Sequence, residues 1–263
     1  MTVSREGAEE SARQLIGMWS ALVEDYGSAV RRGEPVTHIW ANTNFGFYNA
    51  LTFSDSEVGV TALKERFEHS ASFMRDNEHF GFLWIFEELL SDQTREQLDA
   101  LAVAAGLTRG TTCHGMAGDV LPFPEPSHPQ LRFERVRTQE HLDIYASLNA
   151  RAYDLDVPTA QEALHGSRLW REIIHAYIGY FKDLPVCCAG CYPVEGRLFV
   201  VLVAADPAYQ RLGFGEAVTR KAIYEAGKAT GLTRVTLQAT DAGRPVYERI
   251  GLQTTSRVGL FSL

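Results

Sequence analysis

The chain has 263 residues, of which 45% are hydrophobic and 22% are charged. This balance is typical of a packed globular protein and excludes a disordered chain, and the length allows two ordinary domains or one large one. The net charge of −8 argues against a primary role on nucleic acid or an anionic membrane. No run approaches the roughly 18 apolar residues of a membrane span, and the polar, acidic N-terminus is unlike a secretory signal. With four cysteines and no disulfide framework, we expect a cytoplasmic protein.

The first half of the chain changes between helical and strand periodicity. Segments with helical spacing are residues 8–32, 60–74 and 93–105, and segments with strand character are 39–53 and 80–86. Ser54 and Glu57 have the spacing of a capping box, which predicts the start of the second helix. Gly106 follows the third helix and is expected to end it.

A proline-rich segment separates two halves. Residues 122–129, "PFPEPSHP", hold four of the ten prolines, and proline is incompatible with a helix interior or a central strand. We therefore expect an N-terminal domain over 1–121, a linker over 122–130 and a second domain over 131–263. Strands in the second domain are expected over 131–136, 174–180, 186–194, 197–204, 234–240 and 257–263, and helices after Thr138, from about 158, over 215–230 and over 242–250.

The two halves end alike. Residues 106–116 and 251–261 both start with Gly-Leu after a helix, pass through a polar stretch and continue as a strand, over the same distance. Helix–glycine–strand patterns are common, so coincidence stays open beside a duplicated domain.

A strand, a glycine loop and a helix follow one another in "VVLVAADPAYQRLGFGEAVTRKA", residues 200–222. The loop does not fit a Walker A sequence, because no lysine follows Gly215. It does not fit a dinucleotide fingerprint either, because the third small position holds Val218. The pattern Gln/Arg-x-x-Gly-x-Gly/Ala matches in register at Gln210, Gly213 and Gly215.

The physical chemistry of this loop suits a pyrophosphate. Glycines allow the backbone to approach the ligand closely, and the helix that begins near Gly215 adds the positive end of its dipole. Arg211 adds a fixed positive charge, whereas Glu216 is unfavourable beside a phosphate and is expected to point away.

These residues resemble motif A of the GCN5-related N-acetyltransferases, the GNAT superfamily. "TDAGRPVYERIGL" resembles the family's later motif, with Leu252 in place of phenylalanine, and the resemblance covers about residues 131–263. The first half is similar to the N-terminal halves of bacterial tandem GNAT proteins. The resemblance implies an α/β (α+β) fold with a mixed, mostly antiparallel central sheet flanked by helices. It also implies two such halves in tandem, the first having lost cofactor binding.

The resemblance further implies acetyl-CoA as cosubstrate, with amides free on a strand splayed from its neighbour. The implied CoA-binding residues are Val203, Ala204, Ala205, Gln210, Arg211, Leu212, Gly213, Phe214, Gly215, Glu216 and Thr240. Tyr247 matches the family's general acid, and an ordinary tyrosine is protonated at neutral pH. The usual glutamate is Val235 here and the usual asparagine is Thr240, so the general base stays open between a water chain and a residue of the first half. Asp241 is expected to be a helix N-cap rather than this base.

No metal site is expected. Cys187, Cys188 and Cys191 fit small hydrophobic side chains of a buried strand better than a zinc site, which needs four ligands. In the first half, Asn44 and Tyr48 share one expected strand face with other polar residues. That face is either solvated or part of an acceptor site between the domains.

The sequence thus predicts an acetyl-CoA-dependent N-acetyltransferase that acts on the amine of a small molecule or peptide, with a homodimer possible. The acceptor and the preferred acyl chain are not encoded in the loop. Alternatives are another acyl group or an oxygen or sulfur acceptor, a non-catalytic acyl-CoA-binding or regulatory protein, and a structural module that binds no CoA.

Overall fold

The computed structural model describes residues 3–33 and 35–263 and divides into two compact units. Unit 1 comprises Met1–Ala117, Gln238–Pro245 and Gln253–Leu263, and unit 2 comprises Gly118–Leu237 and Val246–Leu252. The last strand of the chain therefore belongs to unit 1. The domain boundaries expected from the sequence stay a prediction.

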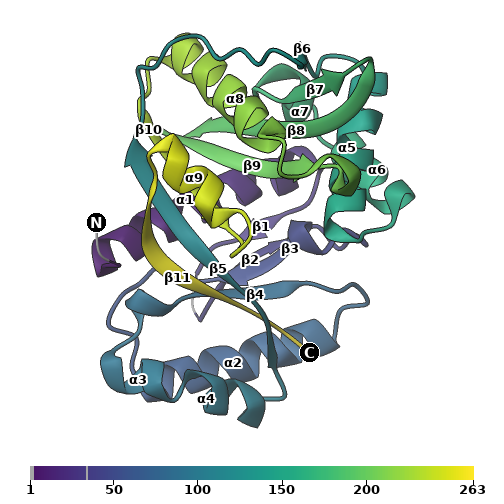
Figure 1. Cartoon of the computed structure of the whole chain (residues 1–263). Coiled ribbons are helices and arrows are strands. Elements are labelled where there is room, and N and C mark those ends of the chain that lie inside the picture. The colour runs from purple at the N-terminus through teal and green to yellow at the C-terminus, as the bar shows by residue number, and fades with distance from the viewer. Residues whose placement is uncertain (1–2, 34) are drawn as a thin grey trace. The chain divides into compact units, whose positions relative to one another are not determined.

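Unit 1 is built on a mixed sheet with strand order β1-β2-β3-β4-β11-β5. The strands are β1 (Val30–Arg31), β2 (Thr37–Trp40), β3 (Asn49–Thr52), β4 (Phe82–Phe86), β5 (Thr108–Asp119) and β11 (Gln253–Ser262), and the helices are α1 (Arg5–Asp25), α2 (Val60–Arg75), α3 (Asp92–Glu96) and α4 (Leu98–Ala104). Strands β3 and β4 are parallel, and the other described pairs of this unit are antiparallel. Figure 1 shows α2, α3 and α4 together on one side of this sheet.

The C-terminal strand β11 lies between β4 and β5 of unit 1 (Figure 1). It runs antiparallel to both, with Val258 opposite Phe86 and Cys113. Strand β5 contains the end of segment 106–116, and β11 contains the end of segment 251–261. The two similar segments therefore form strands that lie next to each other in the sheet. Val258 and Phe261 are fully buried, and Phe261 packs on Phe67 of α2. Strand β11 therefore contributes buried side chains to the core of unit 1.

The strand expected over 39–53 is interrupted. The chain leaves β2 after Trp40, forms a 3-10 turn η1 (Gly46–Tyr48) and then enters β3. The buried Asn49 causes the break, because its side-chain amide donates to the Thr43 carbonyl at 2.7 Å and to the Phe80 carbonyl at 2.8 Å. These bonds hold a loop where the alternating pattern predicted continuous pairing.

The helices of unit 1 differ in their boundaries from those predicted. The predicted strand β4 and helix α2 are confirmed. The predicted capping box at Ser54 and Glu57 is wrong, because α2 begins after Gly59 without a side-chain cap. The first helix ends at Asp25 rather than near residue 32. The third helix is divided at Gln97 into α3 and α4, and Gly106 then adopts the expected positive φ of +83°.

Unit 2 has the strand order β10-β9-β8-β7-β6. Its strands are β6 (Arg132–Arg135), β7 (Tyr177–Phe181), β8 (Leu184–Val194), β9 (Arg197–Ala205) and β10 (Arg234–Ala239), and its helices are α5 (Gln139–Tyr153), α6 (Val157–His165), α7 (Leu169–Glu172), α8 (Phe214–Thr230) and α9 (Arg244–Ile250). β10 is parallel to β9, and the remaining described pairs are antiparallel.

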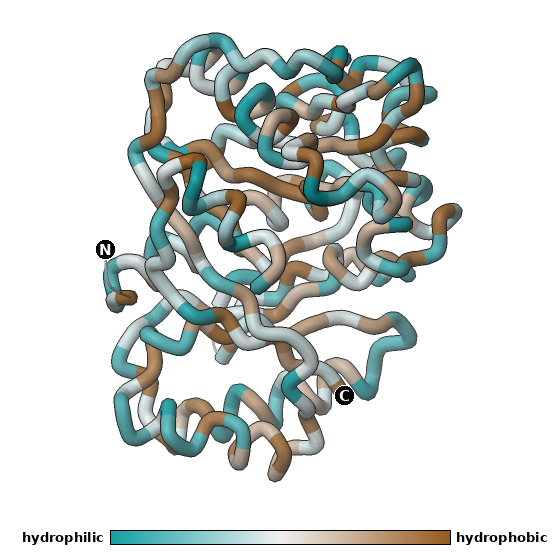
Figure 2. The backbone as a smooth tube through the Cα atoms, in the orientation of Figure 1, coloured by the Kyte–Doolittle hydropathy of each residue, from teal (hydrophilic) through white to brown (hydrophobic). Residues whose placement is uncertain are grey.

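The expected α/β fold with a mixed, mostly antiparallel sheet is thus confirmed. The expected elements of the second half are present, with boundaries moved by a few residues. Figure 2 shows β9 as a largely hydrophobic trace, in agreement with its buried position. None of the described helices has the length and apolar character needed to cross a membrane.

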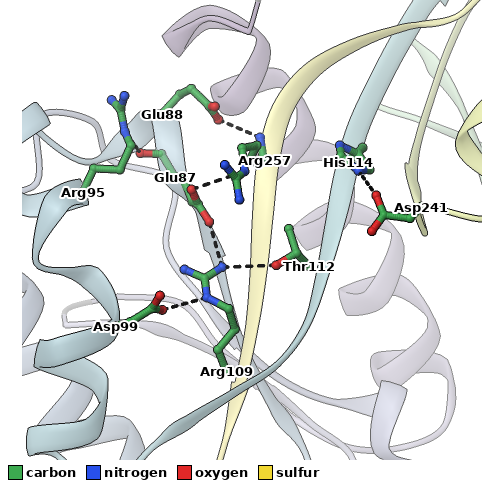
Figure 3. A network of polar contacts seen from close by, with 9 residues as sticks. All are labelled: Glu87, Glu88, Arg95, Asp99, Arg109, Thr112, His114, Asp241 and Arg257. Atoms are coloured by element: carbon green, nitrogen blue, oxygen red, sulfur yellow. Dashed lines mark hydrogen bonds and ion pairs between the residues drawn. The ribbon is translucent and has the colours of Figure 1, made fainter.

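A polar network in unit 1 ties β11 and β5 to the 3-10 turn η2 (Glu87–Leu89), as Figure 3 shows. The Glu87 carboxylate, with only 7% of its side chain exposed, accepts from Arg109 at 2.8 Å and lies 3.7 Å from the Arg257 guanidinium. Arg109 also donates to Asp99 at 2.7 Å, and the Arg257 main-chain N–H donates to Glu88 at 2.9 Å. The network compensates a buried negative charge beside the C-terminal strand.

Replacing Arg109 by methionine should lower the free energy of unfolding by about 3 kcal/mol, because it leaves the Glu87 carboxylate buried with only a distant partner. Urea unfolding measures this change. The control Arg13→Met removes an exposed arginine 4.0 Å from Glu9 and should change stability by about 0.5 kcal/mol or less. Equal losses in the two variants would contradict this role of Arg109.

Candidate active site

The glycine loop leaves the C-terminal end of β9 and leads into α8. After the 3-10 turn η3 (Pro207–Tyr209), Arg211 has a φ of +60° and Gly213 has a φ of +78° directly before the helix. A Cβ atom added to Gly213 would meet nothing within 4 Å, so this side of the loop is open. The expected strand–loop–helix arrangement is present, and it places main-chain groups beside the positive end of a 17-residue helix.

The carboxylates around this loop are paired with arginines. Asp206 accepts from Arg151 at 3.0 Å, and Glu216 accepts from Arg249 at 2.8 Å and from Arg220 at 3.0 Å. Burial raises the pKa of Glu216, but the hydrogen bonds from the two arginines outweigh it, and the pKa is lowered overall. Among the described residues, no ion pair of the exposed Arg211 is found. The loop therefore keeps one arginine available for an anion.

Strand β9 leaves β10 early. The parallel pairing includes only Leu198 with Val235 and Phe199 with Thr236 among the described residues. The pairing of β9 with β8 is itself irregular between Val201 and Ala204, where Leu202 has a φ of +45°. The pairing of β9 with β10 thus ends before Val203–Ala205, which agrees with the splayed strand that the resemblance implies.

Tyr247 lies on α9, and 9% of its surface is exposed. Burial raises the pKa of this phenol, so it is protonated at neutral pH. Its phenol also contributes to the raised pKa of Tyr145 on α5, behind the larger effects of burial, Cys188 and Tyr153. Tyr247 therefore lies near the same helix that contacts β9, which fits a proton donor in this unit.

The turn before α9 differs from expectation. Thr240 caps it: its hydroxyl accepts from the Gly243 N–H at 3.2 Å, and its carbonyl accepts from the Arg244 N–H at 2.9 Å. The expectation that Asp241 is the N-cap is wrong, because its carboxylate accepts from His114 Nε2 at 2.6 Å (Figure 3). This hydrogen bond lowers the pKa of Asp241.

Nothing in the sequence marks His114 as a partner of Asp241. It lies on β5 with 13% of its side chain exposed, and 127 residues separate it from Asp241. No local pattern signals such a pair, because only the folded sheet brings the two segments together.

The two candidate acceptor residues are not on one strand face. Tyr48 is fully buried, with its ring against Trp19, Tyr26 and Phe45. Asn44 lies in the exposed loop, 3.0 Å from His79. The predicted common strand face is wrong, because the chain leaves β2 before Asn44. A role of Asn44 or Tyr48 in binding the acceptor stays a prediction.

The cysteines are structural in character. Cys187, Cys188 and Cys191 are free and buried on β8, and burial raises the pKa of all three thiols, that of Cys187 to about 12. No group of three or more metal-ligating side chains is found within residues 3–33 and 35–263.

Comparisons with known proteins agree with this geometry. Residues 142–252 match the "Acetyltransferase (GNAT) family". A GCN5-related N-acetyltransferase from Kribbella flavida shares the fold with a TM-score of 0.71 and 16% identity, over 96% of this chain and 95% of that one. Another from Sphaerobacter thermophilus has a TM-score of 0.62 and 12% identity, over 96% and 91%. A tandem GNAT protein from the clavulanic acid biosynthesis pathway has a TM-score of 0.57 and 11% identity, over 76% and 69%. No curated protein matches the chain.

The resemblance to the GNAT superfamily is therefore confirmed, and it is carried by residues 142–252, which match the model of this family. The family as a whole transfers acetyl groups from acyl-CoA.

Replacing Glu216 by glutamine should destabilise the protein by about 1 kcal/mol at pH 7, because it breaks the pairs with Arg220 and Arg249. The lowered pKa means that this contribution is fully present above the ordinary value of 4.5 and is lost as the pH falls through the folded-state value. Urea unfolding of both proteins between pH 3 and 7 tests this. A stability difference that does not shrink in acid would contradict the assignment.

Proposed function

We propose that the chain is an acetyl-CoA-dependent N-acetyltransferase that transfers acetyl directly to the amine of a small molecule or peptide. One arrangement carries the proposal: β9 separates from β10 and then runs into a loop with positive φ angles and an available arginine. The open space at Gly213 fits a pyrophosphate, because a side chain there would occupy the path of the phosphates.

Each part of the site has a role in this reaction. Main-chain N–H groups of the loop from Gln210 to Gly215, together with Arg211, bind the pyrophosphate of the substrate. Main-chain groups from Val203 to Ala205 pair with the pantetheine arm, and an N–H there donates to the thioester oxygen as it becomes negative. Thr240 stays a proposed contact of the pantetheine.

Proton movements complete the chemistry. The acceptor ammonium loses one proton to water, and its nitrogen lone pair forms a bond to the thioester carbonyl carbon, whose π electrons move onto the oxygen. The nitrogen then loses a second proton to water. The carbon–sulfur bond then breaks, sulfur keeps the electron pair, and the Tyr247 hydroxyl donates a proton to it. The products are the acetylated amine and CoA with a free thiol, and solvent returns a proton to Tyr247.

Replacing Gly213 by valine should weaken acetyl-CoA binding by about tenfold or more, since the branched side chain enters the phosphate path and the charged hydrogen bonds there are strong. Calorimetric titration with acetyl-CoA measures the affinity. Gly196→Val is a matched control, because Gly196 has a similar φ of +71°, also faces open space, and lies in the turn between β8 and β9. Equal affinities in the two variants would show that the loop does not hold the ligand.

Replacing Tyr247 by phenylalanine should lower the turnover number by about 10²–10⁴-fold, because it removes the proton donor. The affinity for acetyl-CoA should stay the same, since packing of the ring is kept. Steady-state kinetics with an acceptor found by screening amines measures turnover, and Tyr224→Phe on α8 is the control. Unchanged turnover would rule out Tyr247 as the acid.

A non-catalytic acyl-CoA-binding or regulatory protein is the second candidate. The observation that favours it is the residue at position 235. Many relatives have a glutamate there, but this chain has the fully buried Val235, which cannot act as a general base. Such a protein would bind acetyl-CoA and lose the binding in Gly213→Val, but it would acetylate no amine.

A further inference from the structure

Val203 lies where the pairing of β9 is interrupted on both sides. Towards β8, the partners jump from Val201 with Gly190 to Ala204 with Cys188, so Val203 has no strand partner there. Towards β10, the described pairing ends at Phe199. An unpaired stretch of main chain is free to rotate unless other groups hold it.

Two phenols of α5 hold the peptides on either side of Val203. The Tyr145 hydroxyl donates to the Leu202 carbonyl at 2.8 Å, and the Tyr153 hydroxyl donates to the Val203 carbonyl at 2.7 Å. In a planar trans peptide the N–H points opposite to the carbonyl of the preceding residue. The Val203 N–H is therefore directed away from the Tyr145 hydroxyl, and Tyr153 fixes the next peptide plane.

Helix α5 is itself anchored to unit 2 at several points. Tyr145 is fully buried with its ring against Trp170, and the Asn149 amide donates to Cys188 Sγ at 3.2 Å. Near the C-terminal end of the helix, Arg151 donates to Asp206 at 3.0 Å. The phenols are thus attached to a rigid element, which allows them to fix the orientation of an amide.

We infer that Tyr145 and Tyr153 are positioning residues, which direct the Val203 N–H at the thioester oxygen of acetyl-CoA. This inference rests on the proposed function. Electrostatic stabilisation of this kind depends on donors oriented before the reaction, and losing a whole donor costs about 10²–10³ in rate. Losing one of the two tyrosine hydroxyls that orient the donor should lower the rate less, by about tenfold.

Tyr153→Phe is the variant of choice, because 37% of this residue is exposed and the change removes only the hydroxyl. Tyr145→Phe would instead leave a buried carbonyl without its partner. Tyr224→Phe on α8 is again the matched control. Acetyl-CoA labelled with ¹³C at the thioester carbonyl reports polarisation of that bond through its NMR resonance, while calorimetry reports affinity.

The bound resonance should move downfield in the wild type and in Tyr224→Phe, and clearly less in Tyr153→Phe, with dissociation constants within about threefold of each other. With an amine acceptor, kcat should fall about tenfold in Tyr153→Phe while KM for acetyl-CoA stays nearly constant. An unchanged resonance and kcat in Tyr153→Phe, with acetyl-CoA bound, would overturn the positioning role alone. Absence of acetyl-CoA binding to the wild type would overturn the proposed function and this inference with it.

Discussion

The separation of β9 from β10 is the constraint on which the rest of the site depends. After two residue pairs the strands part, and the main chain of β9 from Val200 onward has strand partners only in β8. Unpaired main-chain groups are costly when buried and are otherwise available to a ligand. The phenols of α5 satisfy two of the carbonyls, and the remaining groups at the opening define where an extended ligand would pair.

In the proposed function, the loop after β9 extends this open edge into a site for the pyrophosphate. Its positive φ angles at Arg211 and Gly213 turn the chain into α8 without a bulky side chain in the way. Acidic residues at such a place would repel phosphates, but here Glu216 and Asp206 are bound to arginines. The ion pair of Glu216 with Arg249 connects the start of α8 to α9, so the loop is linked to the helix that carries Tyr247.

Local sequence signals predicted the strand, loop and helix that carry the candidate site. Glycine spacing, an apolar strand and a helical stripe are all properties of neighbouring residues, and the loop at Gln210–Gly215 is where they indicated. The capping box at Ser54 failed because the helix begins five residues later, after Gly59. The break after Trp40 is not visible in the alternating pattern of residues 39–53, because it depends on the hydrogen bonds of the Asn49 side chain to the Thr43 and Phe80 carbonyls.

Contacts between distant segments could not be predicted. The pairing of β11 with β4 and β5 and the hydrogen bond between His114 and Asp241 join residues more than a hundred positions apart. The similarity of segments 106–116 and 251–261 hinted at a relationship, yet nothing in either segment indicated that the two strands pair with each other.

Hydrogen–deuterium exchange with and without acetyl-CoA tests the proposed site most directly, because it reports on the main-chain amides that would bind acetyl-CoA. Acetyl-CoA should slow exchange across residues 203–216 and leave β2, β3 and β4 of unit 1 unchanged. Unaltered exchange at 203–216, or slower exchange confined to unit 1, would contradict the assignment of the splayed strand and its loop as the acetyl-CoA site.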